Sequence, residues 1–483
     1  MWFEWKNKVV VIFAFVFVIA GGVYFLGNNK AQKFHSIELR ENGFTPSEVT
    51  ISLGETVTFT NKTDKPFWPA SDLHPTHGIY PDFDPGEPVQ AGQSWSFKFT
   101  KSGTWNFHDH LNPLYIGVVT VGNVQKISCK LGDKSIECWQ ELLNETLDKD
   151  GLPATFDLIA DLYVKEPLFA SECHSFVHEI GKFAFKKFSS EEGFELNSKT
   201  SYCGYGFYHG FMETLLQATG DVNKAEEFCK YVGKKLAGET TDGEGACYHG
   251  IGHGAVDGSD ERSWGDPQAM IDPGLRLCVL VSKGDNSKYG KLYRCVTGAY
   301  NSIEILSHDP RYKLGKFEKD PFSLCLTQKE EYKEGCYTNM LPAILILTNN
   351  DLLKSQKYID GINENSYEIR KPVTSGLWVE FIRMNLTNIN QDITNGINMC
   401  RQVVEPLQLS CFYGLAEGFM KYGDPKDAYS KGLSFCARGE LKEKERDMCY
   451  NSILTRLRVW YSVDKSREIC QSMPISYQKY CKQ

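Results

Sequence analysis

The pattern of hydrophobic and polar positions divides the chain into three regions. Residues 9–27 are almost continuously apolar. At about 1.5 Å per residue, such a helical run has roughly the length that crosses a bilayer. We therefore expect a transmembrane anchor at 9–27, after a short cytoplasmic end (residues 1–8) and before a polar linker (residues 28–34). A cleaved signal peptide is the alternative, although its apolar region is usually shorter.

Residues 35–123 show the alternation of apolar and polar positions that is typical of β-strands. The segments HSIEL, VTIS, TVTFT and SFKFT alternate in this way, and GVVTV forms a closing strand. Glycine-containing turns, such as Asn42-Gly43 and Leu53-Gly54, separate the segments. Short strands with frequent turns predict an all-β sandwich.

Residues 124–483 have apolar positions at helical spacing, as in HSFVHEIGKFAFKKF. Six related segments, CGYGFYHG, CYHGIGHG, CVTGAYNS, CYTNMLPA, CFYGLAEG and CYNSILTR, follow at intervals of 44, 48, 41, 75 and 38 residues. The interval of 75 leaves room for one more unit at TSGLWVEF, near Gly376, without cysteines. A period of about 40 residues predicts an all-α helical repeat, or solenoid.

All 16 cysteines lie between Cys129 and Cys481. No CxxC motif indicates a zinc ribbon or a thioredoxin-like site, so the even number and close spacing favour disulfides. The spacing suggests the pairs Cys129/Cys138, Cys173/Cys203, Cys229/Cys247, Cys278/Cys295, Cys325/Cys336, Cys400/Cys411, Cys436/Cys449 and Cys470/Cys481. Disulfides persist in oxidising compartments, so we expect a single-pass membrane protein whose domains lie on the extracytoplasmic side. The stapled repeats loosely resemble cysteine-bridged tetratricopeptide-type repeats.

Length and charge limit the function classes. A chain of 483 residues is too long for one core and predicts several domains. The net charge of −8 gives no reason to expect a basic face, so we expect no nucleic-acid partner. Hydrophobic residues make up 41% of the chain, which is enough to build folded cores.

Two segments of the β region carry a family resemblance. GFTPSEVTISLGETVTFTNKTD (43–64) and GTWNFHDHLNPLYIGVVTV (103–121) resemble the opening and closing strands of cupredoxins. The resemblance implies a Greek-key sandwich over residues 35–123. It also implies positions for the blue-copper cysteine, histidine and methionine, where this chain has Asp109, Asn112 and Tyr115. Phe67-Trp68 stands where the first histidine belongs, so a blue site and plastocyanin-like electron transfer are not expected.

Four histidines nevertheless gather at one end of this region: His74, His77, His108 and His110. Residues i and i+2 of a strand share a face, so His108 and His110 can converge. GTWNFHDH is similar to the segment of multicopper oxidases whose two histidines bind copper, which implies that His108 and His110 are ligands. We expect a metal site here, with copper as the cofactor. Exposed loop histidines are the alternative.

A second group of candidate ligands lies in the first helical repeats. His174 and His178, His209 and Glu213, and His249 and His253 are each spaced i, i+4, which places each pair on one helix face. Three such pairs in consecutive repeats would line one groove and hold a second metal ion or an active site. Histidines buried for structural reasons are the alternative. Later repeats lack the pairs.

Three functions remain open on these patterns. The first is a membrane-anchored, extracytoplasmic metal-binding protein, for copper, whose helical domain docks a protein partner or holds a second ion. The second is a metal-dependent oxidoreductase that uses the helical histidine cluster. The third is a cell-envelope scaffold whose concave repeat surface binds other proteins and whose histidines are structural.

Overall fold

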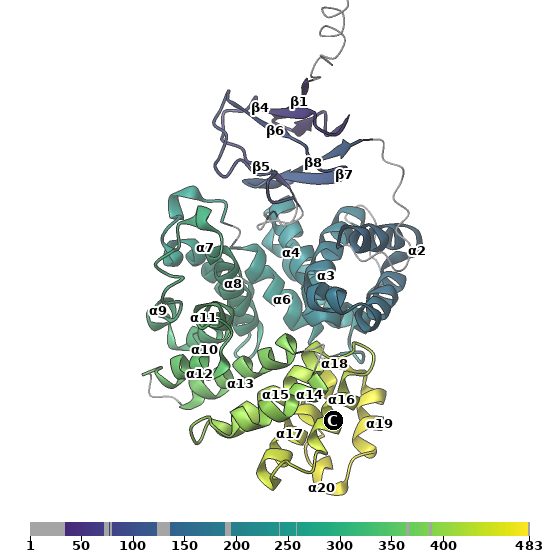
Figure 1. The fold of residues 1–483 in the computed structure, drawn as a ribbon, viewed down its shortest axis with the longest axis vertical. Coiled ribbons are helices and arrows are strands. Elements are labelled where there is room, and N and C mark those ends of the chain that lie inside the picture. Colours follow the sequence, from purple (N-terminus) through teal and green to yellow (C-terminus); the bar gives the residue numbers. More distant parts are fainter. Residues whose placement is uncertain are drawn as a thin grey trace, which may run out of the picture. The chain divides into compact units, whose positions relative to one another are not determined.

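The computed structural model forms two compact units, Met1–Lys126 and Ile127–Gln483 (Figure 1). The structure describes residues 34–71, 77, 80–122, 136–188, 195–240, 242–256, 258–363, 367–385 and 389–481. The anchor predicted at 9–27, like the flanking segments 1–8 and 28–33, lies outside the described residues. Within the described ranges, no helix is long and apolar enough to span a bilayer.

The first unit consists of two four-stranded sheets, with strand orders β2-β1-β4-β6 and β3-β8-β7-β5. Strands β1 and β4 pair in parallel, as do β3 and β8, and the other pairs are antiparallel. The strands are β1 (Phe34–Arg40), β2 (Gly43–Thr45), β3 (Glu48–Ile51), β4 (Thr56–Asn61), β5 (Pro69–Ser71), β6 (Ser94–Lys98), β7 (Gly103–Asp109) and β8 (Asn112–Val121).

Alternation places the core of this unit between apolar faces, as the sequence predicts. In β4, Val57 and Phe59 are fully buried, while the alternate residues Thr56, Thr58 and Thr60 are partly exposed. Phe59, Phe83 and Phe107 pack with ring centroids 5.2 to 5.7 Å apart. Such aromatic burial gives a small domain much of its hydrophobic stabilisation.

The second unit is helical. Its helices are α2 (Ile136–Lys165), α3 (Pro167–Phe188), α4 (Gly206–Thr219), α5 (Val222–Lys235), α6 (Gly243–Gly254), α7 (Pro267–Val281), α8 (Lys291–Ser307), α9 (Phe322–Leu326), α10 (Glu330–Asn339), α11 (Leu341–Leu347), α12 (Leu352–Asp360), α13 (Tyr367–Met384), α14 (Ile389–Cys400), α15 (Gln408–Tyr422), α16 (Ala428–Cys436), α17 (Glu443–Thr455), α18 (Leu457–Trp460), α19 (Val463–Gln471) and α20 (Ile475–Gln478). The short 3-10 helix η1 (Ser198–Tyr205) leads into α4.

Disulfides connect consecutive helices, and seven predicted pairs are confirmed. The structure contains the bridges Cys173–Cys203, Cys229–Cys247, Cys278–Cys295, Cys325–Cys336, Cys400–Cys411, Cys436–Cys449 and Cys470–Cys481. The pair predicted between Cys129 and Cys138 cannot be followed, because Cys129 lies outside the described residues. The cysteine-free unit predicted near Gly376 is α13, which packs between α10 and α15.

Glycines occupy the points at which neighbouring helices of the repeat lie closest together. A Cβ atom on Gly298, in α8, would lie 1.9 Å from the carbonyl oxygen of His249 in α6. In the same pair of helices, a Cβ on Gly252 would lie 1.8 Å from the carbonyl oxygen of Cys295. Only a residue without a side chain permits this approach, so these glycines set the distance between the helices.

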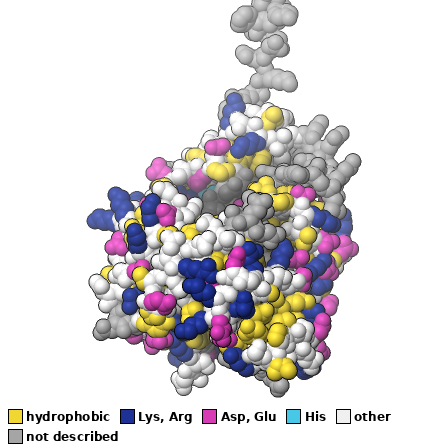
Figure 2. Space-filling model, turned by 60° about the horizontal axis from the view of Figure 1, so that its bottom comes forward, with side chains coloured by type: hydrophobic (Ala, Val, Ile, Leu, Met, Phe, Trp, Pro, Cys, Tyr) yellow, Lys and Arg dark blue, Asp and Glu magenta, His cyan; other side chains and the backbone are white. Residues whose placement is uncertain are grey.

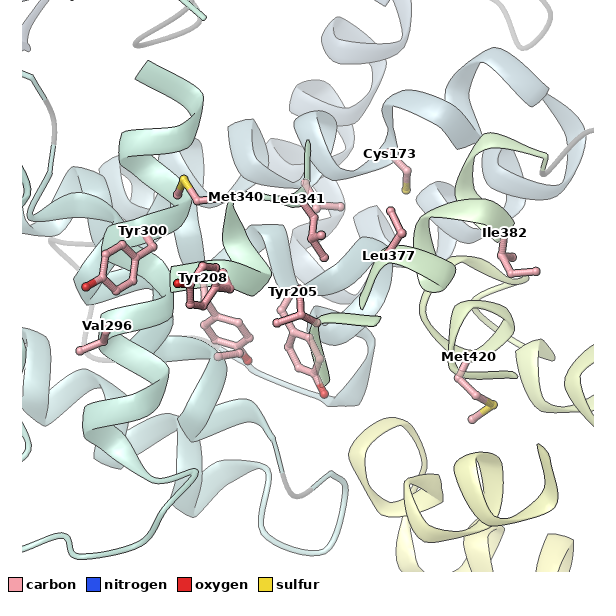
Figure 3. Packing of buried hydrophobic residues seen from close by; sticks show 14 of the residues in the cluster. Cys173, Tyr205, Tyr208, Val296, Tyr300, Met340, Leu341, Leu377, Ile382 and Met420 are labelled. Carbon is pink, nitrogen blue, oxygen red and sulfur yellow. The ribbon is translucent and has the colours of Figure 1, made fainter. Parts of the chain in front are cut away.

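The helical repeat predicted from the sequence closes into a ring. Helices α3, α4, α6, α8, α10, α13, α15 and α17 contact one another in this order. The last repeats then return to the first: the Tyr205 hydroxyl donates to the carbonyl oxygen of Val459 (2.6 Å), and Lys426 pairs with Asp161 (2.8 Å). One continuous hydrophobic core runs through the ring, and Figure 3 shows part of it. The sequence could not predict this closure.

Charged side chains are distributed over the surface without strict separation. Figure 2 shows one face, where lysine and arginine side chains lie beside acidic and hydrophobic ones. Many pairs are local, such as Lys465 with Glu468 at 3.0 Å.

Candidate metal centres

Three buried histidines converge in the first unit. His108 lies near the end of β7, His110 follows in the turn to β8, and His77 comes from the loop after β5. Their side chains are 0–2% exposed, and one ligand nitrogen of each lies within 4.8 Å of the others. The shared face predicted for His108 and His110 is present, with ring centroids 6.2 Å apart. His74, the fourth predicted ligand, lies outside the described residues.

Hydrogen bonds fix the orientation of the His77 ring. Its Nδ1 lies 2.5 Å from Asp84 Oδ2, and its Nε2 lies 2.9 Å from His110 Nδ1. Asp84 also accepts a hydrogen bond from the indole Nε1 of Trp68 (2.8 Å), whose ring packs against His110. A carboxylate on one imidazole nitrogen directs the other nitrogen toward an ion, as is common around metal sites.

The segment between β5 and β6 supplies both His77 and the carboxylate that orients it, Asp84. His77 has a φ of 53°, which is uncommon for a residue other than glycine. Such backbone conformations are concentrated at functional sites, where the surrounding structure maintains them. Asp84 accepts a hydrogen bond from the backbone N–H of Gly86 (2.8 Å), as a turn residue does, and it also orients the His77 ring.

Two residues at the blue-copper positions, Asp109 and Tyr115, form hydrogen bonds with the backbone. Asp109 is buried and accepts hydrogen bonds from the backbone N–H groups of Trp68 (2.7 Å) and Leu111 (3.2 Å). Burial raises the pKa of Asp109 to about 6, although these hydrogen bonds and His108 act in the opposite direction. The Tyr115 hydroxyl donates to the carbonyl oxygen of Glu41. The described residues therefore contain no cysteine thiolate beside these histidines.

The six predicted residues of the helical unit also come together, on α3, α4 and α6. The ring of His209 lies 5.0 Å from His174, 4.7 Å from His249, 5.2 Å from His253 and 6.3 Å from His178, between centroids. These distances satisfy the sequence-based expectation that the three pairs share one region.

Within this cluster, His178, Glu213 and His253 form a tighter group. One ligand atom of each lies within 4.8 Å of the other two, and His178 Nε2 is 3.3 Å from Glu213 Oε2. Burial by itself would raise the pKa of Glu213. Lys182 and His178 together have the larger, opposite effect, and they lower this pKa to about 2. Glu213 is therefore a buried carboxylate that stays ionised.

The histidines of the cluster differ in their charge state. Burial lowers the pKa of His174 and of His253 to about 4, and lowers that of His209 and His249 well below the usual value. These four are neutral near pH 7 and can offer a lone pair. Burial also opposes the charged form of His178, but the neighbouring carboxylates raise its pKa overall.

A large cavity adjoins the helical cluster. It has a volume of about 1130 Å³ and is lined by residues from all sides of the ring, among them His174, His209 and His249. His174 is exposed to this space. The lining also contains Arg294, paired with Asp242, and Arg456, paired with Glu417.

Comparisons with known proteins add little to these observations. No family model and no curated protein matches the chain. Among solved structures, a purple cupredoxin from Nitrosopumilus maritimus is 23% identical to this chain. The match covers 18% of this chain and 99% of the cupredoxin, with a TM-score of 0.17. A methionine-to-alanine mutant of amicyanin in its Cu(I) form is 22% identical over 19% of this chain and 86% of its own, also with a TM-score of 0.17. At these scores, the functional assignment depends on the residues described above.

Proposed function

We propose that the chain is a membrane-anchored, extracytoplasmic metal-binding protein whose cupredoxin-like unit binds copper through His77, His108 and His110. The observation that carries the proposal is the convergence of three buried imidazoles within 4.8 Å. The disulfides support an oxidising compartment. The apolar segment 9–27 supports the anchor.

The donor set fits copper better than it fits most other ions. Imidazole nitrogens bind copper and zinc well, whereas magnesium and calcium prefer oxygen. The nitrogens of His77, His108 and His110 lie close enough together to bind one ion after the hydrogen bond between His77 Nε2 and His110 Nδ1 is given up.

The chemistry of such a site follows from its ligands. Without a cysteine thiolate, the ion would lack the blue-copper geometry that favours fast electron transfer. Capture, storage or delivery of copper is therefore the proposed role. The protein partner expected on the helical unit stays a prediction, and closure of the ring leaves it less concave surface than an open solenoid would offer.

Metal analysis of the full chain tests the proposal. The protein would be purified without chelators, loaded with Cu(II), and compared with the double variant His108→Ala/His110→Ala. The matched control is His35→Ala, because His35 also lies in this unit but pairs with Glu55 at 3.0 Å, away from the cluster. We expect the double variant to lose one copper per chain and the control to keep it. Equal copper content in all three proteins would contradict the assignment.

A further inference from the structure

The helical cluster is built in two layers, one helical turn apart. Each of α3, α4 and α6 contributes one residue to each layer, because members of an i, i+4 pair lie one above the other on a helix face. The layer on the cavity consists of His174, His209 and His249. The layer behind it consists of His178, Glu213 and His253.

The inner layer contains buried polar atoms that the protein leaves unused. Glu213 Oε2 and His253 Nδ1 have no hydrogen-bond partner among the described residues, and the same is true of His209 Nδ1. Glu213 Oε2 approaches His178 Nε2 at 3.3 Å, but not in hydrogen-bonding geometry. Buried polar atoms without partners are rare, and an ion or water that completes them is a common explanation.

The position of Glu213 also suits a cation. Its carboxylate is 3% exposed, and one of its oxygens lies within 4.8 Å of a ring nitrogen of His178 and of His253. A buried carboxylate beside two imidazoles is a ligand set that a divalent metal ion can complete.

Hydrogen bonds fix which ring nitrogen carries the proton in two histidines of the outer layer. His174 Nδ1 donates to the carbonyl oxygen of Cys203 (2.9 Å). His249 Nδ1 donates to the hydroxyl of Thr297 (2.9 Å), because that hydroxyl already donates to the carbonyl oxygen of Arg294 (2.7 Å). In both rings the proton is on Nδ1, so the lone pair is on Nε2. These histidines can bind or orient a small molecule that enters the cavity.

We propose that α3, α4 and α6 hold a divalent transition-metal ion through His178, Glu213 and His253. Two histidines and one carboxylate are the ligands of catalytic zinc sites and of non-haem iron sites, which both keep further positions open. The 3.3 Å between His178 Nε2 and Glu213 Oε2 agrees with two atoms bound to one ion at about 2.1 Å. His209 lines the cavity, and its ring lies 5.2 Å from that of His253 in the inner layer.

This site is separate from the copper site of the first unit, so the two can be tested independently. The test uses the full chain with His108→Ala/His110→Ala as background, which removes the first site. Co(II) is the probe, because its visible absorption reports coordination by the protein. Into this background we would introduce His178→Ala, the near-isosteric Glu213→Gln, or the control His308→Gln. His308 pairs with Glu304 at the same i, i+4 spacing but belongs to neither layer.

We expect the background protein to bind one Co(II) per chain, with absorption bands of protein-bound cobalt. His178→Ala and Glu213→Gln should each weaken binding by at least about 100-fold, and His308→Gln should leave it unchanged. Circular dichroism would verify that each variant is folded. The proposal is overturned if the folded background protein binds no Co(II), or if the variants of the inner layer bind it as well as the control does. If a variant does not fold, the Co(II) titration of the background protein still tests the proposal.

Discussion

Close packing of α3 against α4 predicts that a single methyl group disrupts the helical metal site. In Gly210→Ala, the new Cβ would lie 1.9 Å from the carbonyl oxygen of His178, 2.8 Å from its carbonyl carbon and 3.2 Å from the backbone nitrogen of Lys182. An ordinary contact begins near 3.4 Å. The two helices would therefore have to separate by about 1.5 Å at this point, and no flexible side chain can absorb the movement.

The magnitude follows from two opposing effects. Overpacking of a tight interface costs about 1–3 kcal/mol, and a clash with backbone lies at the upper end of this range. Alanine regains about 1 kcal/mol of helix propensity relative to glycine. We expect a net loss of about 2 kcal/mol in the free energy of unfolding. Because Glu213 lies on α4, it would also move from His178 by far more than the roughly 0.2 Å that metal–ligand bonds tolerate.

The assay is denaturant unfolding followed by circular dichroism, together with Co(II) binding. Gly439→Ala is the matched control, since a Cβ there meets nothing within 4 Å and the backbone is not left-handed. The control should change stability by less than about 0.5 kcal/mol. If Gly210→Ala is as stable as the control and binds Co(II) equally well, the account of close packing between α3 and α4 is wrong.

Three further predictions concern other parts of the chain. Asp84→Asn should weaken copper binding about 10- to 100-fold in a Cu(II) titration, because it orients a ligand histidine. Replacing Cys325 and Cys336 together by serine should lower the free energy of unfolding by about 3 kcal/mol in denaturant titrations. The hydrogen bond to Glu304 raises the pKa of His308, so its stabilisation is complete below the unfolded pKa and is lost as pH rises through the folded pKa. His308→Gln should remove that part of the pH dependence of unfolding.

Local patterns in the sequence were sufficient for much of the structure. Alternation predicted the strands of the first unit, and cysteine spacing predicted the seven disulfides that the structure describes. The i, i+4 pairs predicted that His178, Glu213 and His253 would share one region. In each case, the interacting residues belong to one element or to neighbouring repeats, so spacing along the chain determines their distance in space.

Other features depend on contacts that no local pattern contains. Tyr205 and Val459 are 254 residues apart, yet their hydrogen bond helps to close the ring. Asp84 orients His77 only because of the path that a loop takes. In the sequence alone, an acidic residue between prolines more often indicates a turn. The close packing at the glycines of the repeat involves carbonyl oxygens of a neighbouring helix, which no pattern within one helix predicts.

The most direct test of the central claim is the Cu(II) EPR spectrum and copper content of the full chain, recorded beside His108→Ala/His110→Ala. We predict that the unchanged chain binds one copper more than the double variant, and that this copper shows hyperfine structure from several nitrogen ligands and no intense blue absorption band. Copper that stays bound in the double variant with an unchanged spectrum would contradict the assignment of His77, His108 and His110 as the site.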